Sequence, residues 1–153
     1  FEIYIPLEIK ESKVGSKPFE FIEIVNKLNV LIVEDDEINQ LLLMKLLLNH
    51  GGFNINIANN GLQAIEIVEQ NPYDLIFMDK EMPHMDGYQT TAALRENPKK
   101  EINSIPIIAV SGHPVVNQKE IFDALGFNGY ITKPFRKEEI YEIIYEVLKL
   151  KKS

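Results

Sequence analysis

The sequence Asp74-Leu75-Ile76-Phe77-Met78-Asp79 is a short apolar run that begins and ends in a carboxylate. It is too short for a helix and has no polar residue inside it, which is typical of a parallel strand covered on both faces. Four further strand-like segments lie before and after it, at residues 30–33, 54–58, 105–110 and 129–132. Segments with helical spacing separate them, and this alternation predicts a parallel sheet with helices on both faces.

The segments between the predicted strands carry helical spacing and helix end signals. The predicted helices are residues 38–48, which end at Gly51-Gly52, and residues 62–68, 88–95, 117–125 and 140–148. The last of them has the clearest amphipathic stripe of the chain, with apolar residues at i, i+3, i+4, i+7 and i+8. We therefore expect one doubly wound α/β domain over residues 29–150.

The residues before this domain do not follow the alternation. Residues 1–5 alternate apolar and other side chains, a strand pattern that Pro6 ends. Residues 11–18 are polar and contain glycine and proline, as linkers do. Residues 18–28 fit a short helix and a strand equally well, and the sequence leaves that choice open. We assign residues 10–28 as a linker.

Composition narrows the classes of partner. The chain has 153 residues, of which 16 are basic and 23 acidic, a net charge of -7 and no cysteine. Nucleic acid is not an expected partner, because binding to its backbone needs a concentrated basic face. The missing cysteines exclude disulfides and thiolate metal sites.

The longest leucine-rich stretch, residues 41–48, contains Lys45 and is too short to span a membrane. We expect a cytoplasmic domain without direct membrane contact, whether or not its parent protein is membrane-anchored.

Polar residues follow four of the predicted strands at their carboxyl ends. Asp35 and Asp36 follow the first strand, Asp79 ends the third, Ser111 follows the fourth and Lys133 follows the fifth. In an open parallel sheet these ends meet in one crevice, so the five side chains should share a site. Clustered carboxylates repel one another unless a cation lies among them, and Mg²⁺ prefers such oxygen ligands.

This set of groups fits phosphoryl transfer. Asp79 can coordinate a cation through one oxygen and attack phosphorus with the other, as carboxylate nucleophiles do. The transferred group has three equatorial oxygens, and Ser111, Lys133 and the cation can each take one of them. Each residue alone has an ordinary structural explanation, such as a helix cap for an aspartate pair. The combination is what indicates the chemistry.

At these residues the chain resembles the receiver domain of two-component signalling proteins. The motifs are Val33-Glu34-Asp35-Asp36-Glu37-Ile38-Asn39-Gln40, Phe77-Met78-Asp79-Lys80-Glu81-Met82-Pro83-His84-Met85-Asp86-Gly87 and Tyr130-Ile131-Thr132-Lys133-Pro134-Phe135, and the match covers about residues 29–150. The resemblance implies a flavodoxin-like, five-stranded parallel sheet of order 2-1-3-4-5. It also implies that Asp79 takes a phosphoryl group from a phosphohistidine in a phosphorelay.

The resemblance implies a metal site around Asp79. Asp36, Asp79 and the backbone carbonyl of Glu81 would bind Mg²⁺ or Mn²⁺ directly, and Asp35 would contribute through a water. Glu81 and His113 lie where the family tunes the lifetime of the acyl-phosphate.

The resemblance also implies a switch. Ser111 and Lys133 would bind the phosphoryl group, and Tyr130 would change rotamer together with Ser111. The surface around residues 117–125 and 129–132 would carry the signal. The bond between Lys133 and Pro134 could be cis or trans. His50, His84 and His113 are isolated in the sequence, and we expect each of them on the surface or in a loop.

The amino-terminal segment indicates the larger protein to which the domain belongs. Residues 1–9 are similar to the last strand of a histidine-kinase ATP-binding domain, which implies the receiver end of a hybrid sensor histidine kinase with its kinase domain cut away. Residues 151–153 are assigned as a short tail. The expected partners are a histidine-kinase phosphohistidine domain and a histidine phosphotransfer protein. Beyond self-phosphorylation and slow autodephosphorylation we expect no independent enzyme. An orphan strand at 1–9 predicts dimerisation by edge pairing.

Two other classes stay open. A Mg²⁺-dependent aspartyl-phosphate phosphatase would use Glu81, two residues beyond Asp79, as its second acid. The Asp35-Asp36 pair and Lys133 favour the receiver over this enzyme. A binding module of the same fold that is never phosphorylated would have no need of these residues together.

Overall fold

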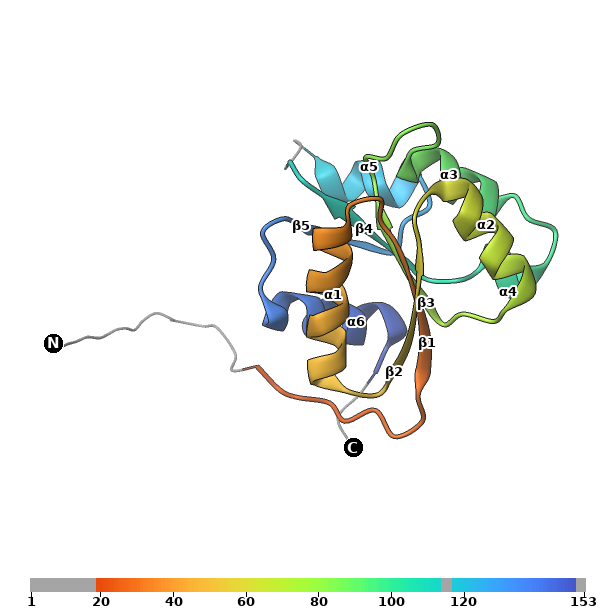
Figure 1. Ribbon diagram of the computed structural model, residues 1–153. Coiled ribbons are helices and arrows are strands. Elements are labelled where there is room, and N and C mark those ends of the chain that lie inside the picture. Colours follow the sequence, from red (N-terminus) through yellow and green to blue (C-terminus); the bar gives the residue numbers. More distant parts are fainter. Residues whose placement is uncertain (1–18, 114–116, 151–153) are drawn as a thin grey trace, which may run out of the picture.

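The computed structural model describes residues 19–113 and 117–150 and contains a five-stranded parallel sheet of order β2-β1-β3-β4-β5. This confirms the predicted doubly wound fold and its strand order (Figure 1). The strands are β1 (Leu28–Val33), β2 (Phe53–Ala58), β3 (Leu75–Asp79), β4 (Ile107–Ser111) and β5 (Gly129–Thr132). The helices are α1 (Glu37–His50), α2 (Gly61–Gln70), α3 (Gly87–Arg95), α4 (Lys100–Asn103), α5 (Gln118–Ala124) and α6 (Lys137–Leu148).

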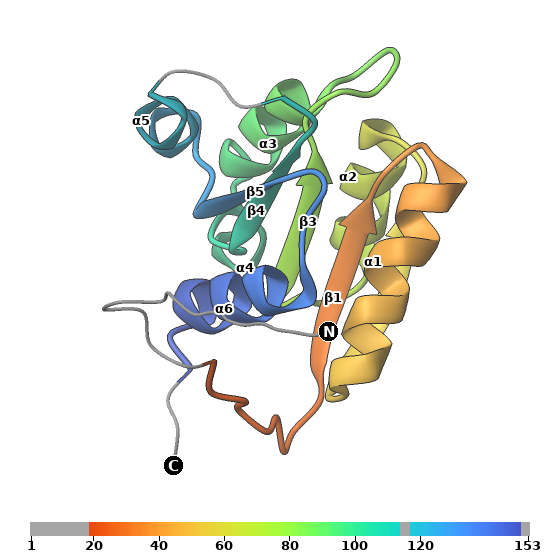
Figure 2. The same ribbon diagram turned by 90° about the vertical axis from the view of Figure 1, so that its left-hand side faces the viewer.

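Helices cover both faces of the sheet. α1 and α6 lie on one face, and α2, α3, α4 and α5 lie on the other (Figures 1 and 2). Successive residues of a strand point to opposite faces, so β3 serves both cores. Ile76 and Met78 pack under α2 to α5, and Leu75 and Phe77 pack under α1 and α6. Both faces are buried, which is why the run at 75–78 has no polar residue.

Local signals set the ends of the helices. Asp36 caps α1 and Asn60 caps α2, each accepting a hydrogen bond from a backbone N–H of the first turn. Asp86 and Gln89 form a reciprocal capping box at α3. Gly51, with φ +84°, ends α1.

The structure differs from the sequence prediction in two elements. α4 was not predicted, because it has four residues, of which only Ile102 is buried, and so shows no helical period. Residues 19–27 are neither a helix nor a strand; they are irregular, with a bend at residues 25–26. The predicted strand at 1–9, the dimerisation expected from it, residues 10–18 of the predicted linker and the tail at 151–153 lie outside the described residues.

Within the described ranges, no helix has the length and apolar character that a membrane span requires. Lys133 and Pro134 are joined by a cis peptide bond.

Candidate functional site

An acidic cluster lies where β1 and β3 end. Glu34 and Asp35 follow β1 directly, and Asp79 is the last residue of β3. One carboxylate oxygen from each residue lies within 4.8 Å of the others. The strands are parallel neighbours, with Val33 opposite Met78, so the residues that follow them meet at one edge. Glu34 and Asp79 are each only 5% exposed.

Asp36, the predicted direct metal ligand, is not part of this cluster. Its carboxylate accepts a hydrogen bond at 3.3 Å from the backbone N–H of Asn39 and caps α1. The buried acidic position belongs to Glu34, whose Oε2 accepts a hydrogen bond at 3.2 Å from the backbone N–H of Asp36. Three consecutive acids at 34–36 can supply the site with either Glu34-Asp35 or Asp35-Asp36, and the sequence prediction used Asp35-Asp36. Aspartate is preferred at the residue before a helix, and this preference is the signal that assigns Asp36 to the cap and leaves Glu34-Asp35 for the site.

Burial controls the charge of the cluster. Burial and the neighbouring Asp79 raise the pKa of Glu34 to about 7. Burial also raises the pKa of Asp79, although Glu34, the backbone N–H of Glu81 and the ammonium of Lys133 act in the opposite direction. Ionised carboxylates this close in a poorly solvated site repel one another. The cluster is therefore stabilised by a proton or by a cation.

Lys133 brings a positive charge to the same edge. It directly follows β5, and its Nζ lies 3.5 Å from Oε1 of Glu34. Its backbone N–H donates a hydrogen bond at 2.8 Å to the carbonyl of Ser111. The ends of β4 and β5 are therefore joined beside the cluster.

Ser111 is buried at the end of β4, next to β3. Asp79 pairs in register with Val110, one residue before Ser111. The Ser111 hydroxyl donates a hydrogen bond at 2.8 Å to the backbone carbonyl of His113. The hydroxyl is thus held by its own loop in this conformation.

The remaining predicted residues lie around the edge of the site. Tyr130 is half-buried on β5, and its ring centroid is 5.4 Å from that of Phe122 on α5. Glu81 and His113 are exposed. A Cβ placed on Gly112 would lie 3.9 Å from Oε1 of Glu81, so the Glu81 carboxylate lies beside the loop that follows Ser111.

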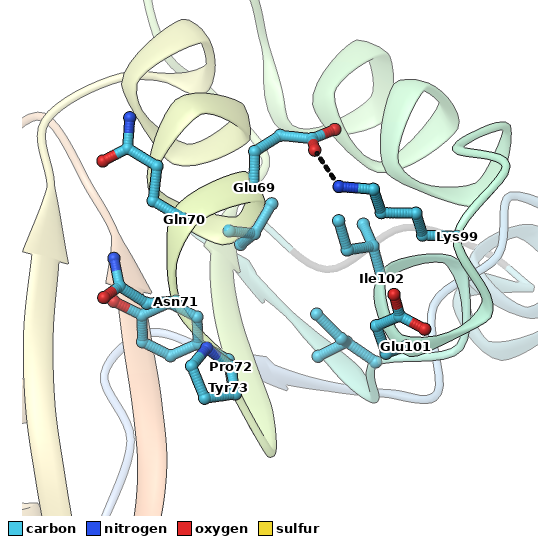
Figure 3. A pocket seen from close by; sticks show the side chains of 10 residues that line it. Glu69, Gln70, Asn71, Pro72, Tyr73, Lys99, Glu101 and Ile102 are labelled. Carbon is cyan, nitrogen blue, oxygen red and sulfur yellow. Dashed lines mark hydrogen bonds and ion pairs between the residues drawn. The ribbon is translucent and has the colours of Figure 1, made fainter.

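A pocket of about 310 Å³ lies at the other end of the strands, between α2 and α4 (Figure 3). Tyr73 and Ile102 line it, and Lys99 forms an ion pair with Glu69 at 3.3 Å across its rim. Its lining includes none of the predicted site residues.

The fold and the site together define a class: a doubly wound α/β domain with an acidic cluster, a hydroxyl and an ammonium at the carboxyl ends of its strands. The chain belongs to the response regulator receiver domain family, whose model matches residues 30–145. It is a receiver domain of two-component phosphorelay signalling.

Known proteins similar to the chain include histidine kinases. It is 41% identical over 120 residues to hybrid signal transduction histidine kinase I of Dictyostelium discoideum, a match that covers 75% of this chain and 7% of that protein. It is 36% identical over 136 residues to the sensor protein EvgS of Escherichia coli, covering 88% of this chain and 11% of that protein. The chain therefore spans only a small part of these relatives.

A solved structure carries the same fold. It is the receiver domain of a sensor histidine kinase from Pseudomonas aeruginosa, with a magnesium ion coordinated in its active-site cleft. The TM-score is 0.70 at 29% identity, and the match covers 80% of this chain and 98% of that one.

Proposed function

We propose that Asp79 is the phosphoacceptor of this receiver domain, and that Glu34, Asp35 and Asp79 hold Mg²⁺ or Mn²⁺ during the transfer. The observation that carries the proposal is the burial of Asp79 within 4.8 Å of two other acids. Carboxylate oxygens in this number fit a hard divalent cation. The backbone carbonyl of Glu81 would be a further ligand. This set replaces Asp36 by Glu34 and leaves Asp36 as the cap of α1.

The residues around Asp79 then have distinct tasks. One oxygen of Asp79 attacks the phosphorus of a phosphohistidine, the phosphorus–nitrogen bond breaks, and its electron pair returns to the imidazole. When bound, the cation supplies positive charge to the transferred oxygens. Lys133 offers its ammonium to the same group, and Glu34 holds that ammonium at the site through the 3.5 Å ion pair.

Ser111 links the transfer to a change of shape. Its hydroxyl must leave the carbonyl of His113 before it can donate to a phosphoryl oxygen on Asp79. The loop between β4 and α5 then loses one of its hydrogen bonds. Tyr130 contacts Phe122 of α5, so a movement of α5 changes the packing of Tyr130. The surface around α5 and β5 would report the phosphorylation.

The donor must approach beside α1. This helix begins at Glu37, next to the cluster, and exposes Ile38 by 75% and Leu41 by 63%. Exposed apolar side chains beside a site mark a docking surface. We infer that a histidine-kinase phosphohistidine domain or a histidine phosphotransfer protein docks there, and that the parent protein is a hybrid sensor histidine kinase like the relatives named above.

The register of the acidic pair gives a sharp test. Asp35→Asn should abolish the stimulation by Mg²⁺ of phosphorylation from acetyl phosphate, because it removes a carboxylate from the cluster. Asp36→Asn should keep that stimulation, since asparagine caps a helix as well as aspartate does. Phosphorylation is followed by intact mass with and without EDTA. The reverse pattern would return the ligand role to Asp36, and sustained phosphate release from small phosphoesters would indicate a phosphatase.

A further inference from the structure

Residues 19–27, here called the tether, pack against the body of the domain although they have no regular secondary structure. The ring centroid of Phe19 lies 6.2 Å from that of Tyr145 and 6.0 Å from that of Tyr141, both on α6. Phe21 stacks on His50, the last residue of α1, with centroids 4.5 Å apart. The tether therefore contacts the ends of both helices that cover this face of the sheet.

A chain of hydrogen bonds joins the tether to the two helices. The backbone N–H of Ile22 donates to the hydroxyl of Tyr145 at 3.1 Å, and that hydroxyl lies 2.6 Å from Nε2 of His50. Nδ1 of His50 lies 2.7 Å from the carbonyl of Gly51. A carbonyl only accepts, so this network assigns the proton to Nδ1 and makes Nε2 the acceptor of the Tyr145 hydroxyl.

The Tyr145 hydroxyl both accepts from the backbone N–H of Ile22 and donates to His50, and the side chains of Tyr145 and His50 are buried. His50 and Tyr145 are each 8% exposed, so His50 is not the surface residue that the sequence predicted. Without the Tyr145 hydroxyl, the N–H of Ile22 and Nε2 of His50 would lose their hydrogen bonds. A buried polar group without a partner is unfavourable by about 1–3 kcal/mol. The hydroxyl therefore links the tether to α1 and α6.

Gly52 leaves the space that the tether needs beside the end of α1. The sequence predicts Gly51-Gly52 together as the helix end, but Gly51 alone caps α1 in the structure. Gly52 has φ +91°, and a Cβ on it would lie 2.6 Å from the Cβ of Ile24. The tether crosses so close to Gly52 that no side chain fits between them. The backbone N–H of Leu28 then donates to the Gly52 carbonyl at 2.9 Å, and β1 begins.

The tether lies at the amino ends of the strands. In Figures 1 and 2 it runs below α6 and past the lower end of α1 before it enters β1, whereas the strands end at the opposite edge. That opposite edge carries Asp79. A docked tether therefore makes the preceding chain leave the domain on the side away from the phosphoacceptor.

We propose that docking of the tether limits how far the chain before the receiver can extend. The hydrogen bonds of the Tyr145 hydroxyl hold the tether in this docked position. Docking holds residues 19–27 against α1 and α6. Release frees nine residues, which span up to about 30 Å when extended. A domain attached upstream can use that length to approach Asp79 only when the tether is released. The reach toward Asp79 rests on the proposed role of Asp79 as phosphoacceptor, whereas the docking is tested without phosphorylation.

Hydrogen exchange of the full chain tests whether the Tyr145 hydroxyl holds the tether in place. In the wild type, the Ile22 amide should exchange at least tenfold more slowly than in an unstructured peptide. Tyr145→Phe should remove that protection. Tyr141→Phe is the matched control, because Tyr141 also contacts Phe19 but donates its hydroxyl to the Leu46 carbonyl and not to the tether. It should leave the exchange of the tether unchanged.

Distances give a second readout. The chain has no cysteine, so spin labels at Glu23→Cys and Glu66→Cys are specific. One narrow distance distribution is expected in the wild type and in Tyr141→Phe, and a broad one in Tyr145→Phe. Unprotected tether amides in the wild type, or equal behaviour of the two tyrosine variants in both measurements, would overturn the proposal.

Discussion

The charge of Glu34 depends strongly on its surroundings. Its pKa is raised to about 7 by burial and by Asp79, whereas an exposed glutamate titrates near 4.5. Between these values the folded protein binds a proton that the unfolded chain does not. Stability linked to Glu34 is therefore fully present below pH 4.5 and is lost as the pH rises through 7.

The substitution Glu34→Gln isolates this effect, because glutamine resembles the protonated side chain. In EDTA at pH 5 the variant and the wild type should have similar free energies of unfolding. At pH 8 the variant should be more stable, by about 1–3 kcal/mol. Urea unfolding at the two pH values measures the difference. A difference that does not change with pH would show that Glu34 is ionised throughout.

Among the elements, α1 serves both ends of the domain. Its first turn lies beside the acidic cluster, and its last residue, His50, belongs to the network of the tether. Its buried side chains hold it on the sheet, and four large apolar residues stay exposed. These are Ile38, Leu41, Leu42 and Leu48.

Two substitutions on α1 separate docking from chemistry. Leu41→Glu should slow phosphotransfer from a phosphorylated histidine phosphotransfer protein at least tenfold, because a charge replaces apolar contact area near the site. Leu48→Glu places the same charge about two turns farther away and should have little effect. Both should accept phosphate from acetyl phosphate at the wild-type rate. Equal transfer rates from the protein donor would contradict docking on α1.

At the scale of the whole molecule, the sequence predicts the sheet well because its signals are strong and local. The apolar run at 75–78 is typical of a strand covered on both faces, and Asp79, Ser111 and Lys133 each lie at or just after the end of a strand. The order of the strands came from the family resemblance, since the alternation alone does not specify which strands are neighbours.

The parts that the sequence could not predict depend on contacts between distant segments. Which acid of 34–36 turns inward is decided by where α1 begins. The packing of residues 19–27 depends on Tyr145 and on the space at Gly52, which no pattern near the tether reveals. α4 has too few residues for a period to appear.

The molecule thus places its acidic cluster and its tether at opposite ends of one sheet, and Asp79 is the residue proposed to take the phosphoryl group. The most direct test of this role is the intact mass of the chain after incubation with acetyl phosphate and Mg²⁺, beside Asp79→Asn. We predict one added phosphoryl group in the wild type, and none in the variant or in EDTA. An equal adduct in the Asp79→Asn variant, or no adduct in the wild type at any time, would contradict the account.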